Sequence, residues 1–81
     1  MKLNIYAVKD TVVGEMGNPF YLNNDEMAKR SFKNAINNGT DIQLKLNYAD
    51  TQLYKLGVLD TVTGEIESNV EFIMNGIEAK V

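Results

Sequence analysis

The residues best suited to chemistry in this chain are three cations, Lys29, Arg30 and Lys33, in the stretch LNNDEMAKRSFKNAIN. Side chains three or four residues apart share one side of a helix, so these charges can form a single positive surface that contacts phosphate groups. The alternative is an ordinary solvated helix face. Glu26 precedes Lys29 by three residues and Arg30 by four, so local ion pairs can neutralise part of the charge.

Bases stack on exposed aromatic rings, each stack contributing about 1–3 kcal/mol, so a single-stranded nucleic-acid site also needs aromatic side chains. Phe20 and Tyr21 follow the only proline, just before the predicted helix. A hydrophobic staple or a loop plug is the alternative role for both. Tyr21 is the better stacking candidate because its hydroxyl tolerates water. The candidate nucleic-acid-binding residues are Lys29, Arg30, Lys33, Tyr21, Phe20 and Lys9.

Residue types exclude most catalytic chemistry. The chain has no cysteine and no histidine, which removes disulfides, thiol nucleophiles, the usual zinc sites and the imidazole base. Asp60, Glu65 and Glu67 lack the ligand spacing of a calcium loop, so a solvated turn is the favoured interpretation. We therefore expect no enzymatic activity, no metal and no cofactor.

The overall charge argues against a nucleic-acid partner. Eleven acidic residues outnumber eight basic ones, giving a net charge of -3, the opposite of the usual footprint of a nucleic-acid-binding domain. Binding by one protomer would be weak, so useful affinity would need a dimer or an array. The polar residues of MKLNIYAVKD do not fit a signal peptide and no apolar run is long enough for a membrane span, so we expect a cytoplasmic protein without membrane contact.

The elements that must position these residues follow from periodicity. Alternation predicts a strand over Lys2–Val8, and the glycines, asparagine and proline of VVGEMGNPF predict a loop. A helix is expected from a cap at Asn24 or Asp25 to Gly39. Its apolar stripe, which must face a sheet, consists of Ala28, Phe32, Ala35 and Ile36.

The pattern of the second half of the chain predicts β-strands. DIQLKLNY alternates over 42–48, TQLYKLGVLD follows, and a turn from Asp60 to Gly64 leads into a strand over Glu65–Met74. Asn75-Gly76 predicts a hairpin whose second arm is 77–81. Tyr6 and Tyr54 lie in strands, where sheet packing is favoured over base stacking. The prediction is one α+β domain over 1–81: a twisted, mainly antiparallel sheet of four to five strands with one helix packed on one face.

Several of these segments, in this order, carry a family resemblance. LNIYAVKD, NPF, the helix DEMAKRSFKNAINN and the stretch DTQLYKLGVLDTVTGEI resemble the small non-structural protein of gokushovirus-type microviruses, phages with circular single-stranded DNA genomes. The resemblance runs from about Leu3 to Ile66. It does not cover the alternation of 42–48 or the tail from Glu67, so the predicted strand and the last hairpin rest on periodicity alone.

The resemblance implies a role in phage genome replication inside the bacterial host cytoplasm, as a DNA-binding protein or a factor in the switch to single-strand synthesis. It supplies no catalytic residues. The leading hypothesis is therefore a non-catalytic single-stranded-DNA-binding or replication accessory protein, and a homodimer is expected through an open sheet edge. The alternative is a protein-interaction module that modulates the phage initiator, host replication factors or procapsid assembly without binding DNA.

Overall fold

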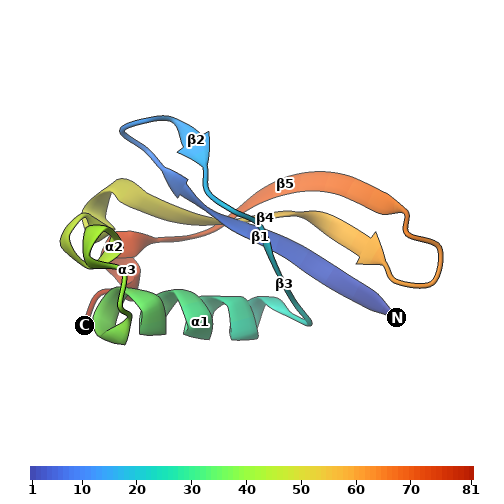
Figure 1. The fold of residues 1–81 in the computed structure, drawn as a ribbon, viewed down its shortest axis with the longest axis horizontal. Helices are drawn as coiled ribbons and strands as arrows, with labels where there is room; N and C mark the ends of the chain where they lie inside the picture. Colours follow the sequence, from blue (N-terminus) through green and yellow to red (C-terminus); the bar gives the residue numbers. More distant parts are fainter.

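The computed structural model describes all 81 residues and has the predicted α+β architecture, a twisted, open antiparallel sheet with its long helix across one face (Figure 1). The sheet order is β2-β1-β4-β5, and β3 also pairs with β1. The elements are β1 (Lys2–Asp10), β2 (Glu15–Met16), β3 (Phe20–Leu22), α1 (Asp25–Asn38), α2 (Ile42–Leu46), the 3-10 turn η1 (Tyr48–Asp50), β4 (Thr51–Asp60), β5 (Ile66–Asn75) and α3 (Gly76–Ala79).

Helix α1 begins and ends where the sequence predicts. The Asn24 side chain accepts a hydrogen bond from the Met27 amide at 2.9 Å, and two acidic residues occupy the first turn, where the helix dipole favours them. At the other end, the Gly39 amide donates to the Ala35 carbonyl. The buried side of the helix presents Ala28, Phe32 and Ile36 to the sheet.

The core lies between α1 and one face of the sheet. Its strand residues are Tyr6, Leu53 and Met74, and Ala79 of α3 closes one end. Tyr6 is fully buried, and its hydroxyl donates to Asp25 Oδ1 at 2.6 Å, which ties the central strand to the first turn of α1. This confirms the packing interpretation of Tyr6.

The strand predicted over 42–48 is wrong, because these residues form α2 followed by the turn η1. Asp41 caps the short helix by accepting from the amides of Gln43 and Leu44 at 3.0 and 3.2 Å. Only Leu44 and Tyr48 of the alternating apolar residues pack against the core, while Ile42 and Leu46 stay exposed. Alternation over so short a segment did not distinguish a strand from one helical turn.

The hairpin predicted at Asn75-Gly76 is also wrong. The chain forms the four-residue helix α3 instead, and the Glu78 carboxylate accepts from the Asn75 amide at 3.2 Å. A Cβ at position 76 would overlap the Tyr48 carbonyl oxygen, so glycine here allows close backbone approach rather than a tight turn. Burial of Ala79 against α1 holds the tail beside the helix in place of a sixth strand.

The predicted loop between β1 and α1 is partly wrong. Residues Glu15–Met16 and Phe20–Leu22 pair with β1 as β2 and β3, on the edge opposite β4. Gly14 adopts a positive φ of 82° in the intervening turn, and the Gly17 amide donates to the Val8 carbonyl at 2.8 Å. Both short strands therefore rest on hydrogen bonds to β1, a tertiary contribution that composition does not reveal.

Candidate nucleic-acid interface

The sheet has one face covered by α1 and one face without a helix. Strand register assigns residues to the two faces, because directly paired residues of antiparallel strands share a face. Tyr6 faces α1, so its chain neighbours Ile5 and Ala7 lie on the other side. We call that side the open face. The pairing assigns to it Ile5, Ala7, Lys9, Tyr21, Tyr54, Gly57, Ile66, Ser68 and Phe72, and alternation between the last two adds Val70.

Two aromatic rings meet at the middle of the open face. Ala7, Tyr54 and Phe72 pair side by side across β1, β4 and β5. The rings of Tyr54 and Phe72 are 5.7 Å apart between centroids and inclined by 72°, an edge-to-face contact. Phe72 is 45% exposed. The Lys9 ammonium nitrogen lies 5.8 Å from the centroid of the Tyr54 ring, so a cation borders the aromatic pair.

Tyr21 reaches the same face from β3, where it pairs with Ile5 and is 49% exposed. Its neighbour Phe20 pairs with Tyr6 and therefore points the other way, towards the core. The Phe20 and Tyr6 rings stack at 5.8 Å between centroids. The two adjacent aromatics thus have different roles: Phe20 packs against the core, and Tyr21 is presented to solvent.

The three helix cations form a ridge along the exposed side of α1, which we call the cationic ridge: Lys29, Arg30 and Lys33. The Lys29 ammonium lies 3.5 Å from Glu26 Oε1, and the Glu26 side chain is 85% exposed. An exposed pair of this kind contributes little and is screened by salt. Arg30 and Lys33 form no ion pair, so most of the ridge charge remains available.

The structure therefore divides the predicted nucleic-acid site. The cationic ridge faces away from the sheet on the α1 side, while Tyr21 and Lys9 lie on the open face. A single extended strand of DNA cannot contact both sets without passing around the edge of the sheet. Adjacency in sequence predicted a shared site, but the register of β3 on β1 separates the aromatic residue from the helix that follows it.

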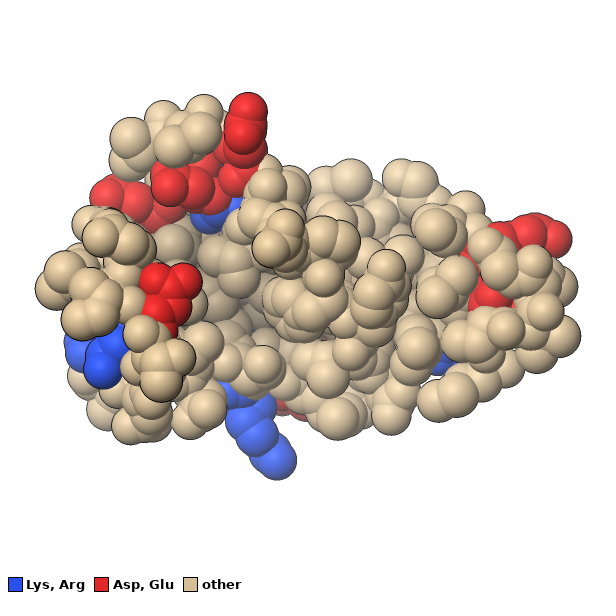
Figure 2. All heavy atoms as spheres, viewed as in Figure 1, with Lys and Arg blue, Asp and Glu red and all other residues tan.

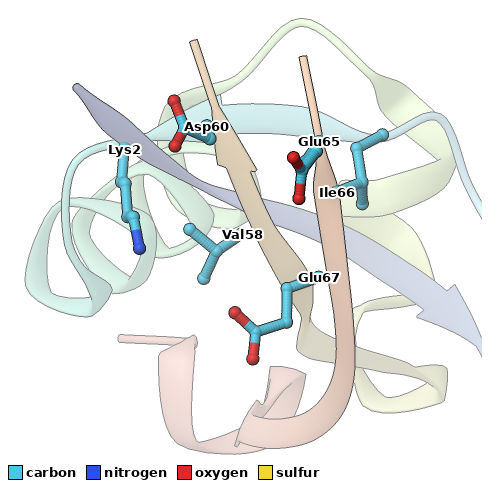
Figure 3. Close-up of a pocket in the computed structure, with 6 residues that line it drawn as sticks. All are labelled: Lys2, Val58, Asp60, Glu65, Ile66 and Glu67. Carbon is cyan, nitrogen blue, oxygen red and sulfur yellow. The ribbon is translucent and has the colours of Figure 1, made fainter. Parts of the chain in front are cut away.

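Acidic side chains gather at the two ends of the long axis (Figure 2). One group, by the β1–β2 turn and α2, contains Asp10, Asp41 and Asp50. The other group, by the β4–β5 turn, contains Asp60, Glu65 and Glu67. The second group borders a shallow hollow shared with Lys2 and Val58 (Figure 3). Amides of Val62 and Thr63 donate to the Asp60 carboxylate and lower its pKa, which is typical of an ordinary turn.

No group of three acidic, histidine or cysteine side chains is arranged to hold a metal ion. No helix has the length and apolar composition needed to cross a bilayer. The molecule presents two broad surfaces, the open face and the cationic ridge.

The phage ORF5 protein family model matches residues 3–79, nearly the whole chain. The chain belongs to this family. The match extends through β5 and α3, beyond the part of the sequence that carries the resemblance noted above. No curated protein and no solved structure matches the chain. The family match shows that the chain is a phage protein. Its binding partner has to be inferred from the open face and the cationic ridge.

Sequence reasoning did not select Phe72. Simple alternation along β4 would also place Tyr54 and Val58 on the same face, but register shifts separate them. Leu56 is an extra residue of β4 opposite β1, so Tyr54 lies on the open face while Val58, which pairs with Asn4, lies on the α1 side. The strict alternation of Ile66, Ser68, Val70 and Phe72 was the available signal for the open face.

Proposed function

We propose that this phage ORF5 protein is a non-catalytic, single-stranded-DNA-binding accessory of genome replication. We further propose that its phage is of the gokushovirus type, with a single-stranded DNA genome, and that the protein acts in the bacterial cytoplasm. In this proposal bases stack on the open face, and the aromatic set of Tyr21, Tyr54 and Phe72 bordered by Lys9 is the observation that carries it.

Spacing on the open face suits successive bases. Tyr54 and Phe72 are on neighbouring strands, whereas Tyr21 is two strands and one two-residue step away from Tyr54. With about 4.8 Å between strands and about 6.8 Å for the step, the backbone positions of Tyr21 and Tyr54 lie about 12 Å apart. Ala7 and Gly57 lie between the rings and are buried, so the bases would stack on the exposed rings on either side of them. An extended single strand can therefore place separate bases on the two ends of the platform.

Energetics favour stacking over charge at this site. Two or three stacked bases contribute about 1–3 kcal/mol each, while Lys9 supplies roughly one phosphate contact with a salt slope of about -0.7. The cationic ridge would instead supply three contacts and a slope of about -2. The slope therefore identifies which surface holds the strand.

The test is fluorescence anisotropy with a labelled deoxythymidine oligonucleotide, titrated at several salt concentrations. Tyr21→Ala removes an exposed ring and is expected to weaken binding by about 1–3 kcal/mol. Tyr21→Phe is the matched control, because it keeps the ring and removes a hydroxyl that has no hydrogen-bond partner in the chain; it should bind like the unaltered protein. The Lys29→Glu, Arg30→Glu, Lys33→Glu triple variant should also retain most binding.

Other outcomes assign the surface differently. Loss of binding in the triple variant, with Tyr21→Ala unaffected, would move the site to the cationic ridge. Absence of binding even in dilute buffer would favour the second candidate, a module that contacts phage or host replication proteins, or procapsid components. The exposed apolar residues Ile66 and Val70 and the net charge of -3 support that candidate.

A further inference from the structure

We propose that two copies of the chain pair through the outer edges of their β5 strands, about a two-fold axis that passes beside Val70. The pairing would join two sheets into one and make the two open faces continuous. This inference rests on the edge of the sheet and does not depend on the DNA-binding proposal.

Strand β5 is the unprotected edge. It is ten residues long, stands last in the sheet order and has β4 on one side only. All seven residues from Ile66 to Phe72 are exposed, and Ile66 and Val70 are 64% and 61% exposed. The strand contains no proline or lysine, the residues that usually prevent edge pairing, so its free amides and carbonyls form a template for another strand.

The opposite edge is not available in the same way. There β1 is covered by β2 and β3, which have two and three residues and follow each other along one strand. A chain with one long free edge closes its assembly by pairing that edge with its own copy, because a head-to-tail arrangement would need two complementary edges. The partner that fits β5 is therefore a second copy of β5, antiparallel to the first.

Charge disfavours the two registers on either side of Val70. In a symmetric antiparallel pair, the residue numbers of two directly opposed residues always add up to twice the number of the residue at the axis. Like charges directly opposite each other are destabilising. An axis at residue 69 places Glu67 opposite Glu71 of the second copy, and an axis at Glu71 places that residue opposite itself. An axis at Val70 avoids both, because it sets Glu71 opposite Asn69 and brings the two valines together.

This register also preserves the division between faces. Phe72 then lies opposite Ser68 of the second copy, both on the open face, so each ring has space beside a small side chain. Each protomer has a surface of 5321 Å². A standard interface of about 800 Å² per partner would cover about 15% of it. In this register only Ser68–Phe72 can pair with like faces together, because Ile66 lies on the open face and Met74 in the core. These residues span about 17 Å of strand, so with the flanking apolar side chains the interface lies at the lower end of the size range.

Light scattering after size exclusion tests the dimer. At about 200 µM the protein should have twice the 9.1 kDa mass of one chain, since interfaces near the lower size limit dissociate in the micromolar range. Val70→Glu adds two carboxylates at the axis and should shift the dimer dissociation constant upward by at least tenfold. Val12→Glu is the matched control: its valine is 75% exposed in the β1–β2 turn, and the substitution should leave the dimer intact.

Cysteine substitution tests the register, since the chain has no other cysteine. Directly opposed residues have Cα atoms about 4.5–5.5 Å apart, within disulfide range, so Val70→Cys should oxidise readily to a covalent dimer. Ser68→Cys should not, because an axis at Val70 separates the two Ser68 positions by about 14 Å. Far-UV circular dichroism verifies that each variant is folded.

A protein that remains monomeric at 200 µM overturns the proposal. A dimer that persists in folded Val70→Glu, or one that Ser68→Cys crosslinks faster than Val70→Cys, overturns the stated interface or its register. Oligonucleotide binding distinguishes the dimer proposal from the DNA-binding proposal, because Tyr21 lies on β3, at the edge of the sheet opposite β5. Tyr21→Ala is expected to weaken DNA binding without changing the dimer.

Discussion

Replacement of Tyr6 by phenylalanine measures how strongly α1 is attached to the sheet. The Tyr6 hydroxyl donates to Asp25 Oδ1 at 2.6 Å and accepts from Asn4 Nδ2 at 2.9 Å, joining β1 to the first turn of the helix. Phenylalanine removes only the hydroxyl. The ring and its stack on Phe20 are retained, so no cavity contributes to the effect.

The magnitude follows from the acceptor. A hydrogen bond to a charged group contributes about 1.5–3 kcal/mol. Asp25 is half-buried, so its carboxylate can recover part of its hydration, which places the expected loss at about 1.5–2 kcal/mol. A domain of 81 residues has a free energy of unfolding of about 4–12 kcal/mol, at about 0.05–0.15 kcal/mol per residue. The loss is a large fraction of that range.

Urea unfolding followed by far-UV circular dichroism is the assay. Tyr6→Phe should lower the midpoint without changing the slope, because the surface exposed on unfolding stays the same. Tyr21→Phe is the control for loss of a hydroxyl and should change the free energy of unfolding by less than about 0.5 kcal/mol. A Tyr6→Phe, Asp25→Ala double-mutant cycle should give a coupling free energy of about 1–2 kcal/mol.

Alkaline pH provides an independent measure of the same contact. Burial, reinforced by the hydrogen bond to Asp25, raises the pKa of Tyr6 from 10.0 to about 12. The folded protein therefore keeps the Tyr6 proton at pH values where the unfolded chain has lost it. The resulting stabilisation is complete below pH 10 and is lost as the pH rises from 10 to 12, by an amount on the order of 1–3 kcal/mol. Tyr6→Phe should lack this component of the alkaline transition.

A loss below about 0.5 kcal/mol in Tyr6→Phe, together with an alkaline transition identical to that of the unaltered protein, would refute the role assigned to the hydroxyl. The attachment of α1 to β1 would then depend on apolar packing alone.

Two further substitutions test local features of the fold by the same urea assay. Gly76→Ala should lower the free energy of unfolding by about 2–4 kcal/mol, because the new Cβ overlaps the Tyr48 carbonyl oxygen. Gly64→Ala is the control: this residue has a positive φ and open space around it, so the loss should be only about 1 kcal/mol. Equal losses at the two positions would contradict the close approach at Gly76. Asn24→Ala should cost about 1 kcal/mol by removing the N-cap of α1. Asn34→Ala, at an exposed helical position, should be neutral or slightly stabilising, and a similar loss at both sites would argue against the cap.

The helix and the long strands were predictable because their signals are local. The cap at Asn24, the stripe of Ala28, Phe32 and Ile36 and the turn from Asp60 to Gly64 each lie within a few neighbouring residues. Family resemblance and the family match agree on a phage protein, although the DNA-binding role remains a prediction. Of the predicted site residues, the cations of the ridge do share one side of α1, as their spacing required.

Contacts between segments far apart in the sequence decided the elements and side-chain orientations that the sequence did not predict. The segment 42–48 and the tail after Asn75 became helices because Leu44, Tyr48 and Ala79 pack around the end of α1. Pairing of β3 with β1 turned Tyr21 away from the helix, and an extra residue at Leu56 moved Val58 to the face opposite Tyr54. The sequence alone therefore determined the element types with strong local periodicity and the charges of the ridge. Only the tertiary structure decided which face each aromatic ring occupies, because a one-residue change of register reverses the side to which a strand residue points.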